Sequence, residues 1–145
     1  MLKWLLLVYK VPPKPTSNRV YVWRKLKKLG AFLWHDAVWI LPSTTKTKEH
    51  FQWLAAEIKE LGGEAQVWQA DSLLMGQEEM LVQQFESQAN AAYAAIIEQL
   101  SQPEADLAAA SRAYQQIRQY DYFHSEIGDR VRELLVTGRG GGLEE

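Results

Sequence analysis

The chain has 145 residues, 47% of them hydrophobic and 23% charged, which is typical of one globular domain. Cysteine is absent, and this excludes a disulfide framework, a thiolate zinc site, an iron–sulfur cluster and a cysteine nucleophile. Apolar runs such as residues 5–8 are far shorter than a membrane span, and residues 1–10 are too short for a secretory signal. We therefore expect a cytoplasmic protein.

The formal net charge of −2 conceals an uneven distribution. Residues 1–62 contain eleven Lys/Arg and four Asp/Glu, a balance of +7, whereas residues 63–145 contain five and fourteen, a balance of −9. The last of the six tryptophans is Trp68, so the C-terminal half of the chain has none. An anionic partner for the basic half would explain this asymmetry, and so would neutralisation of one half by the other across an internal or dimer interface.

The N-terminal segment, up to Gly30, predicts a strand followed by a helix. Residues 4–11 are apolar and run into a proline-rich stretch, which is typical of a buried strand. Ser17 is a candidate N-cap for a helix that continues to Leu29 and stops at Gly30. The predicted core stripe of this helix has helical spacing and consists of Val22, Leu26 and Leu29.

The segment from Ala31 to Ala70 predicts a hairpin, a helix and a strand. Residues 31–35 and 37–41 are strand-like and meet at a tight turn. The Ser/Thr cluster 43–47 leads into a second helix that ends at two glycines, and residues 64–70 form a further strand. The apolar face of the second helix is predicted to consist of Phe51, Leu54, Ala55, Ile58 and Leu61.

This order of elements predicts an α+β fold. Strand, helix, strand, strand, helix, strand is the order of a ferredoxin-like βαββαβ sandwich, in which two helices cover one face of a four-stranded antiparallel sheet. We assign residues 1–72 to this sandwich.

The remaining chain has helical periodicity. Residues 77–100 form one helix, Pro103 is placed to open the next in its first turn, and residues 121–125 interrupt the pattern before a last helix. Frequent alanines favour a helical hairpin, which we assign to residues 73–137 and expect to pack on the sandwich as one unit. Residues 138–145 are predicted to be a disordered tail.

The helix that begins near Ser17 carries the strongest functional signal. It contains no acidic residue, and most of its cations lie opposite the predicted core stripe. Unopposed positive charge on one helix face suits a phosphate backbone, although a lysine-rich face is also common on helices that only meet solvent. The candidate nucleic-acid-binding residues are Arg19, Arg24, Lys25, Lys27 and Lys28.

The sequence offers little support for metal or catalytic chemistry. His35 and Asp36 could form a metal or acid–base pair, but a turn explains them better. His50 and His124 have no ligand-like spacing, and neither a glycine-rich phosphate loop nor a serine nucleophile motif is present. We therefore expect no metal, no cofactor and no enzymatic activity.

Trp53 lies off the apolar stripe of its predicted helix. A large exposed aromatic side chain favours a covering partner, either the C-terminal hairpin or a second copy of the chain.

Several stretches together resemble the N-terminal domain of ChrB, a family of bacterial chromate-resistance regulators. The resemblance covers about residues 3–136 and depends on the order of the motifs rather than on one of them. The similar stretches are Trp4–Tyr9, Pro12–Pro13, Arg19–Arg24, Val38–Pro42, Trp53–Ile58, Leu61–Ala65 and Ile117–Phe123.

The resemblance implies DNA binding and transcriptional control of chromate-efflux genes. In that family a second, C-terminal domain is associated with the chromate response, and the resemblance of this chain covers only the first domain. We therefore expect DNA as a partner, with a homodimer or a separate chain of the ChrB C-terminal type as further candidates.

The sheet region also resembles, more distantly, the CRISPR adaptation nuclease and PaaX-type repressors. The nuclease holds its metal with an aspartate at the end of the first strand, where this chain has Tyr9 and Lys10. A lysine would repel the cation, so a metal-dependent nuclease is the least favoured interpretation. A nucleic-acid-binding regulator is the most favoured, and a dimerising protein-interaction scaffold is the main alternative.

Overall fold

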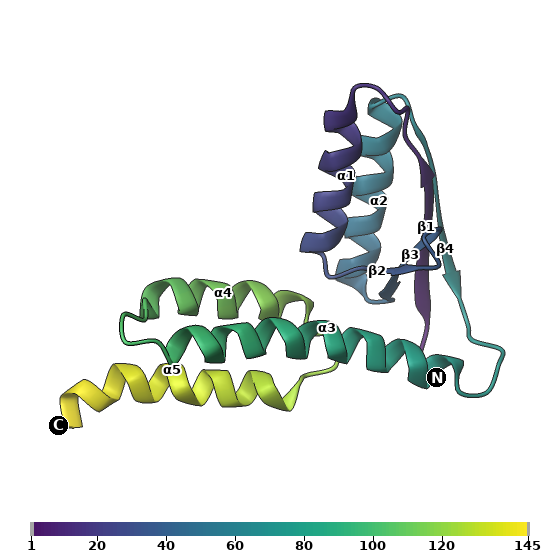
Figure 1. The fold of residues 1–145 in the computed structure, drawn as a ribbon. Helices are drawn as coiled ribbons and strands as arrows, with labels where there is room; N and C mark the ends of the chain where they lie inside the picture. The colour runs from purple at the N-terminus through teal and green to yellow at the C-terminus, as the bar shows by residue number, and fades with distance from the viewer. Residues whose placement is uncertain (1, 145) are drawn as a thin grey trace. The chain divides into compact units, whose positions relative to one another are not determined.

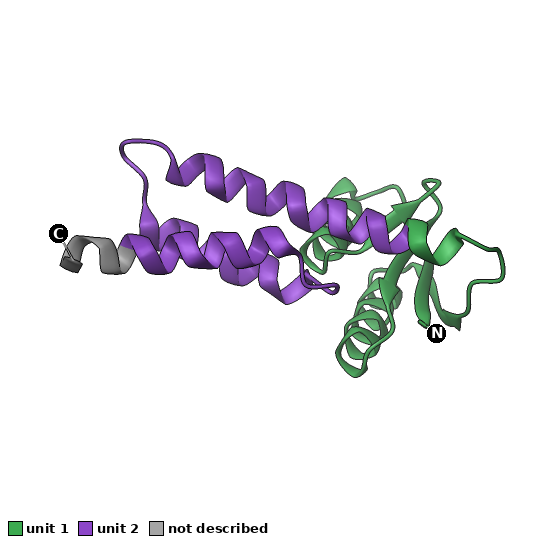
Figure 2. Cartoon of the chain, turned by 90° about the horizontal axis from the view of Figure 1, so that it is seen from below, with its two compact units in different colours: residues 1–80 green, residues 81–145 purple. Residues whose placement is uncertain are grey.

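The computed structural model describes residues 2–138 in full and, of residues 139–144, only the helical backbone. The chain forms two compact units, Met1–Met80 (unit 1) and Leu81–Glu145 (unit 2), which Figure 2 colours separately. The boundary falls within the first turns of a single long helix, Gln77–Leu100.

Unit 1 is an α+β unit, as the sequence predicts (Figure 1). Its four strands form one antiparallel sheet in the order β2-β3-β1-β4, and its two helices lie side by side on one face of that sheet. The elements are β1 (Trp4–Lys10), α1 (Thr16–Lys28), β2 (Phe32–Trp34), β3 (Val38–Pro42), α2 (Thr45–Glu60) and β4 (Glu64–Ala70).

The central strand β1 sets the two faces of the sheet. Leu5 and Leu7 are fully buried, and Tyr9 continues the same alternation toward the end of the strand. Since Tyr9 lines a cavity together with residues of α1, this row of side chains faces the helices. The register places Leu7 opposite Trp39 on one side and Val67 on the other, so the buried row crosses three strands.

Helix α1 packs on the sheet through Val22 and Leu26, two of the three predicted core positions. Its N-cap residue is Pro15, which forms no side-chain capping bond, so the predicted cap at Ser17 is wrong. The fixed φ of proline suits the start of a helix, and Ser17 therefore lies within the first turn. The helix ends as predicted, because Gly30 takes a φ of 73°.

The hairpin between β2 and β3 confirms the turn at His35 and Asp36. Both residues have left-handed φ angles, 52° and 57°, as the two central residues of a type I′ turn require. The Ala37 N–H donates to the Trp34 carbonyl at 3.1 Å and closes the turn. The left-handed backbone of the turn therefore explains why His35 and Asp36 stand here, and a metal site is not needed to explain them.

Helix α2 begins at a reciprocal capping box. Thr44 and Thr47 each accept a hydrogen bond from the other's backbone N–H, and the buried Thr47 hydroxyl also donates to the Pro42 carbonyl at 2.6 Å. Phe51, Leu54 and Ile58 form its buried face, as predicted.

Unit 2 contains most of α3 (Gln77–Leu100), all of α4 (Leu107–Tyr120) and α5, which is assigned as Glu126–Glu144. The three helices share one core, so α5 completes a three-helix arrangement rather than following a two-helix hairpin. The buried core residues are Ala89, Tyr93, Ile96, Ala110, Tyr114, Ile117, Val131 and Leu135. The tail predicted for residues 138–145 lies almost wholly outside the fully described residues.

The start of α4 differs from the prediction. Pro103 lies in the connecting loop, and the helix begins only at Leu107. The Asp106 carboxylate accepts a hydrogen bond from the Ala109 N–H at 3.1 Å, and this side-chain cap, rather than the proline, fixes the start.

Asp121 organises the predicted interruption between α4 and α5. Its carboxylate accepts the Ser125 N–H and the hydroxyl of the buried Tyr93, each at 3.0 Å. Burial first, and the hydrogen bond to Asp121 second, raise the pKa of Tyr93. The interruption is therefore a fixed corner tied to α3.

Candidate nucleic-acid interface

Helix α1 presents three stripes of side chains four residues apart. Residues four apart on a helix share a face, so each stripe looks in one direction. The sheet-side stripe is Arg19, Trp23 and Lys27; the outer stripe is Val20, Arg24 and Lys28; the α2-side stripe is Tyr21 and Lys25. The five predicted basic residues are all exposed.

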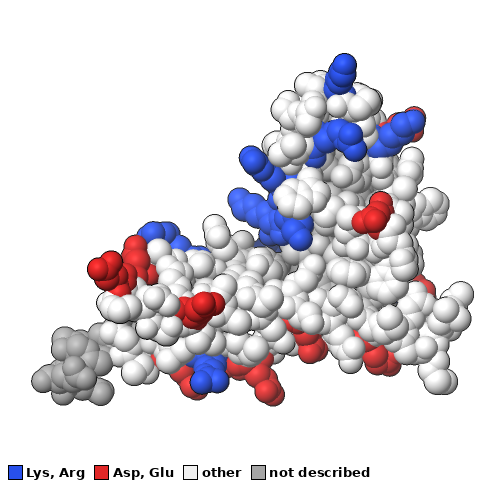
Figure 3. Space-filling model, viewed as in Figure 1, with Lys and Arg blue, Asp and Glu red and all other residues white. Residues whose placement is uncertain are grey.

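The outer stripe is the part of α1 farthest from the protein core. Arg24 and Lys28 lie opposite the buried Val22 and Leu26, so their charged groups have no packing role. Figure 3 shows Lys and Arg side chains gathered over the helical layer of unit 1. Lysines in a last turn also interact favourably with the helix dipole, which accounts for part of their placement at this end of α1.

The two flanking lysines lie over aromatic rings. The Lys25 ammonium is 5.6 Å from the centroid of Tyr21, and the Lys27 ammonium is 5.7 Å from that of Trp23. The Tyr21 hydroxyl donates a hydrogen bond to Glu57 of α2, and this bond raises the pKa of the tyrosine. Tyr21 is thus engaged with α2, whereas Trp23 remains half exposed.

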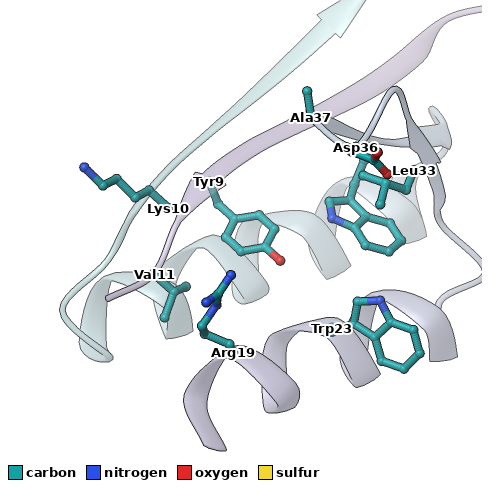
Figure 4. A pocket seen from close by; sticks show the side chains of 9 residues that line it. Tyr9, Lys10, Val11, Arg19, Trp23, Leu33, Asp36 and Ala37 are labelled. Atoms are coloured by element: carbon teal, nitrogen blue, oxygen red, sulfur yellow. The ribbon is translucent and has the colours of Figure 1, made fainter. Parts of the chain in front are cut away.

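Arg19 shares the sheet-side stripe with Lys27 but lies at the N-terminal end of α1. It lines a cavity of about 350 Å³ between α1, the end of β1 and the β2–β3 hairpin. In Figure 4, Tyr9 from β1 and Arg19 from α1 point toward one another, and Trp23 lies farther along the helix. The lining residues are Tyr9, Lys10, Val11, Arg19, Trp23, Leu33, Asp36, Ala37 and Trp39.

The cavity combines aromatic rings with charges. Burial raises the pKa of Tyr9, while a hydrogen bond with Trp39 and the charge of Arg19 act in the opposite direction. The rings of Tyr9 and Trp39 thus line the cavity beside the Arg19 guanidinium group.

The structure therefore divides the predicted site in two. Arg24 and Lys28 lie on the outer stripe with Lys25 and Lys27 on the stripes that flank it, while Arg19 lines a cavity that we did not predict. Alternation along β1 could have placed Tyr9 toward the helices. No local signal could have predicted that Asp36 and Trp39 lie near Arg19, because the pairing of β3 with the distant strand β1 places them there.

No metal site or membrane span stands out in the described part of the chain. Within it, no three His, Asp or Glu side chains gather as a metal ion would require. None of its helices is both long enough and apolar enough to cross a bilayer.

Trp53 is 69% exposed, so nothing in unit 1 covers it. The cover expected from the C-terminal helices or a second copy remains a prediction.

A four-stranded antiparallel sheet with a cation-rich helix, joined to a helical unit, defines a small α+β protein. The chain belongs to the family of the ChrB N-terminal domain, whose model, described as "Protein ChrB, N-terminal", matches residues 19–133. This confirms the resemblance and relates the chain to chromate-resistance regulators, a regulatory rather than a known enzyme family. Neither the curated proteins nor the solved structures contain a significant match.

Proposed function

We propose that the protein is a DNA-binding module of a transcriptional regulator in chromate resistance, and that α1 contacts the DNA backbone. The observation that carries this proposal is the exposed, acid-free cationic surface of α1, with Arg24 and Lys28 at its centre. Lysine and arginine on one helix face neutralise phosphates and release their counterions. Membership of a regulator family supports the same function.

The proposed scaffold for this helix is a ferredoxin-like sandwich. The element order β1-α1-β2-β3-α2-β4 and the strand order β2-β3-β1-β4 support it. In such a unit the sheet holds α1 rigidly through Val22 and Leu26, so the opposite face is presented as a fixed surface.

The test is the affinity of the full chain for a mixed-sequence DNA duplex. Replacing Arg24 and Lys28 together by alanine removes two exposed charges and touches no buried position. We expect at least a roughly tenfold weaker dissociation constant, measured by fluorescence anisotropy, since hydrogen bonds to charged groups contribute about 1.5–3 kcal/mol each.

Lys46 and Lys48 provide a matched control. Both are exposed cations of the same unit, at the start of α2 rather than on α1. Lys46→Ala/Lys48→Ala removes the same net charge, so it separates a local contact from general attraction. Equal weakening by the two double variants would reject α1 as the interface.

A protein-interaction scaffold is a second candidate, favoured by exposed apolar side chains. The loop after β4 exposes Leu73, Leu74 and Met75 almost completely, and Trp53 is exposed on α2. If these side chains hold a second copy, sedimentation velocity should show a dimer that Trp53→Ser or Leu73→Ser dissociates. A monomer at all concentrations would exclude self-association.

A further inference from the structure

The cavity that contains Arg19 is not part of the outer stripe of α1, and the DNA-backbone contact makes no use of it. It opens between α1 and the β2–β3 hairpin, entirely within unit 1. Its volume of about 350 Å³ lies within the range typical of small-molecule sites.

Its aromatic lining suits a flat ring. Trp23 is half exposed on α1, Trp39 is buried on β3, and Tyr9 lies between the sheet and the helix. Aromatic side chains stack on nucleobases with little dependence on sequence, because every base has a π-face. Trp39 is buried and Tyr9 is half-buried, so packing restrains two of these rings before any ligand arrives.

Its cations suit a phosphate. Arg19 offers a planar fork of donors at the cavity. The Lys10 side chain, by contrast, extends away from the cavity (Figure 4). Lys27 lies over the Trp23 ring at 5.7 Å and brings a second cation close to one of the lining rings. These charges favour an anionic ligand over a neutral aromatic one.

Asp36 adds a hydrogen-bond acceptor. The type I′ turn, in which Asp36 has a φ of 57°, places this residue on the cavity wall. A carboxylate accepts hydrogen bonds from the exocyclic amino group of a base, as in contacts to cytosine. Rings, cations and one carboxylate at the same cavity match the base, the phosphate and the exocyclic amino group of a nucleotide.

We propose that this cavity binds one unstacked nucleotide, with its base among Tyr9, Trp23 and Trp39 and its phosphate on Arg19. The same chemistry is offered by a free mononucleotide and by an unpaired nucleotide within a single strand. The site is separate from the outer stripe of α1, so nucleotide binding in the cavity can be tested independently of duplex binding.

The first experiment is calorimetric titration of the full chain with AMP, CMP, GMP and dTMP. Ribose 5-phosphate and adenosine provide the phosphate and the base separately. We expect the mononucleotides to bind at least about tenfold more tightly than either half, since both the base and the phosphate contribute. If ribose 5-phosphate bound as tightly as AMP, the proposal would be overturned, because the aromatic rings of the cavity would then contribute nothing to binding.

Variants locate the ligand in the cavity. Trp23→Leu and Arg19→Ala change exposed positions, and each should weaken binding about tenfold. Trp53→Leu and Lys48→Ala remove an exposed tryptophan and an exposed cation outside the cavity and should leave binding unchanged. Asp36→Gly keeps the positive φ and should abolish preference for CMP over dTMP, which lacks an amino group.

A short oligo(dT) or oligo(dC) strand distinguishes a free mononucleotide from an unpaired nucleotide within a single strand as the ligand. Tight binding of a mononucleotide assigns the site to a free nucleotide. Binding of the strand alone, lost in Trp23→Leu, assigns it to a single strand. If neither binds, or if Trp23→Leu and Arg19→Ala bind as the unmodified protein does, the proposal is wrong. Duplex affinity of the same variants, judged against Arg24→Ala/Lys28→Ala, shows separately whether the proposed function fails.

Discussion

Gly63 lies where α2 leads into β4 and approaches the end of β1. A Cβ at this position would come within 2.3 Å of the Lys10 carbonyl oxygen and 2.9 Å of the Ile58 side chain. Since the nearer atom is backbone, the clash cannot be relieved by a side-chain rotation. We expect Gly63→Ala to lower the free energy of unfolding of unit 1 by about 2 kcal/mol or more. Tryptophan fluorescence in urea reports this, because all six tryptophans lie within unit 1.

The preceding glycine supplies the comparison. Gly62 has a φ of 86°, but the nearest atom to a Cβ there is 3.9 Å away. Asparagine adopts left-handed backbone comparatively easily, so Gly62→Asn should cost about 1 kcal/mol or less. A loss as large as that of Gly63→Ala would show that the contact with Lys10 is not the limiting one.

At the scale of elements, the corner between α4 and α5 makes unit 2 sensitive to alkaline pH. The pKa of Tyr93 is raised by burial and by its bond to Asp121, and burial raises the pKa of Tyr122 to about 12. A tyrosine whose pKa is higher in the folded state contributes stability below pH 10, its ordinary pKa, and loses it as the pH rises toward the folded value. We therefore expect unit 2, followed by circular dichroism, to lose stability steadily above pH 10.

Tyr93→Phe isolates the contribution of Tyr93 to this effect. The variant loses one hydrogen bond, so it should be about 1 kcal/mol less stable at neutral pH. Its further loss of stability between pH 8 and 11 should be smaller than that of the unmodified chain, because one hydroxyl with a raised pKa has been removed. Identical pH profiles for the two proteins would contradict the assignment to Tyr93.

The elements that the sequence predicted best are those specified by local chemistry. The bounds of β4 and α3 match the prediction, since strand alternation and helical periodicity are local, and left-handed residues fix the hairpin turn. Ser17 and Pro103 failed as boundary signals because neighbouring residues, Pro15 and Asp106, occupy the cap positions. Local sequence indicates that a cap is present but not which of two nearby candidates is used.

The residues of the candidate site likewise differ in whether local sequence could predict them. Periodicity places Arg24 and Lys28 opposite Val22, so the outer stripe could be predicted from α1 alone. The partners of Arg19 come from β1, β3 and the hairpin turn. They depend on the pairing of β1 with β3, two strands far apart in the sequence, which no local pattern encodes.

For the whole molecule, the distribution of charge implies that DNA affinity depends on local contacts rather than on the net charge. The chain carries a net charge of −2, and residues 63–145 carry most of its acidic groups. Long-range attraction to a polyanion is therefore weak, and the exposed cations of unit 1 must supply the binding energy through direct phosphate contacts.

The salt dependence of duplex affinity tests this account most directly. The logarithm of the binding constant should fall linearly with the logarithm of salt concentration, with a slope of about −0.9 for each phosphate contacted. We predict a slope shallower by nearly two units for Arg24→Ala/Lys28→Ala, at an unchanged melting temperature, and an unchanged slope for Lys46→Ala/Lys48→Ala. The same slope in the unmodified chain and the α1 double variant would contradict the central claim that the outer stripe of α1 binds the DNA backbone.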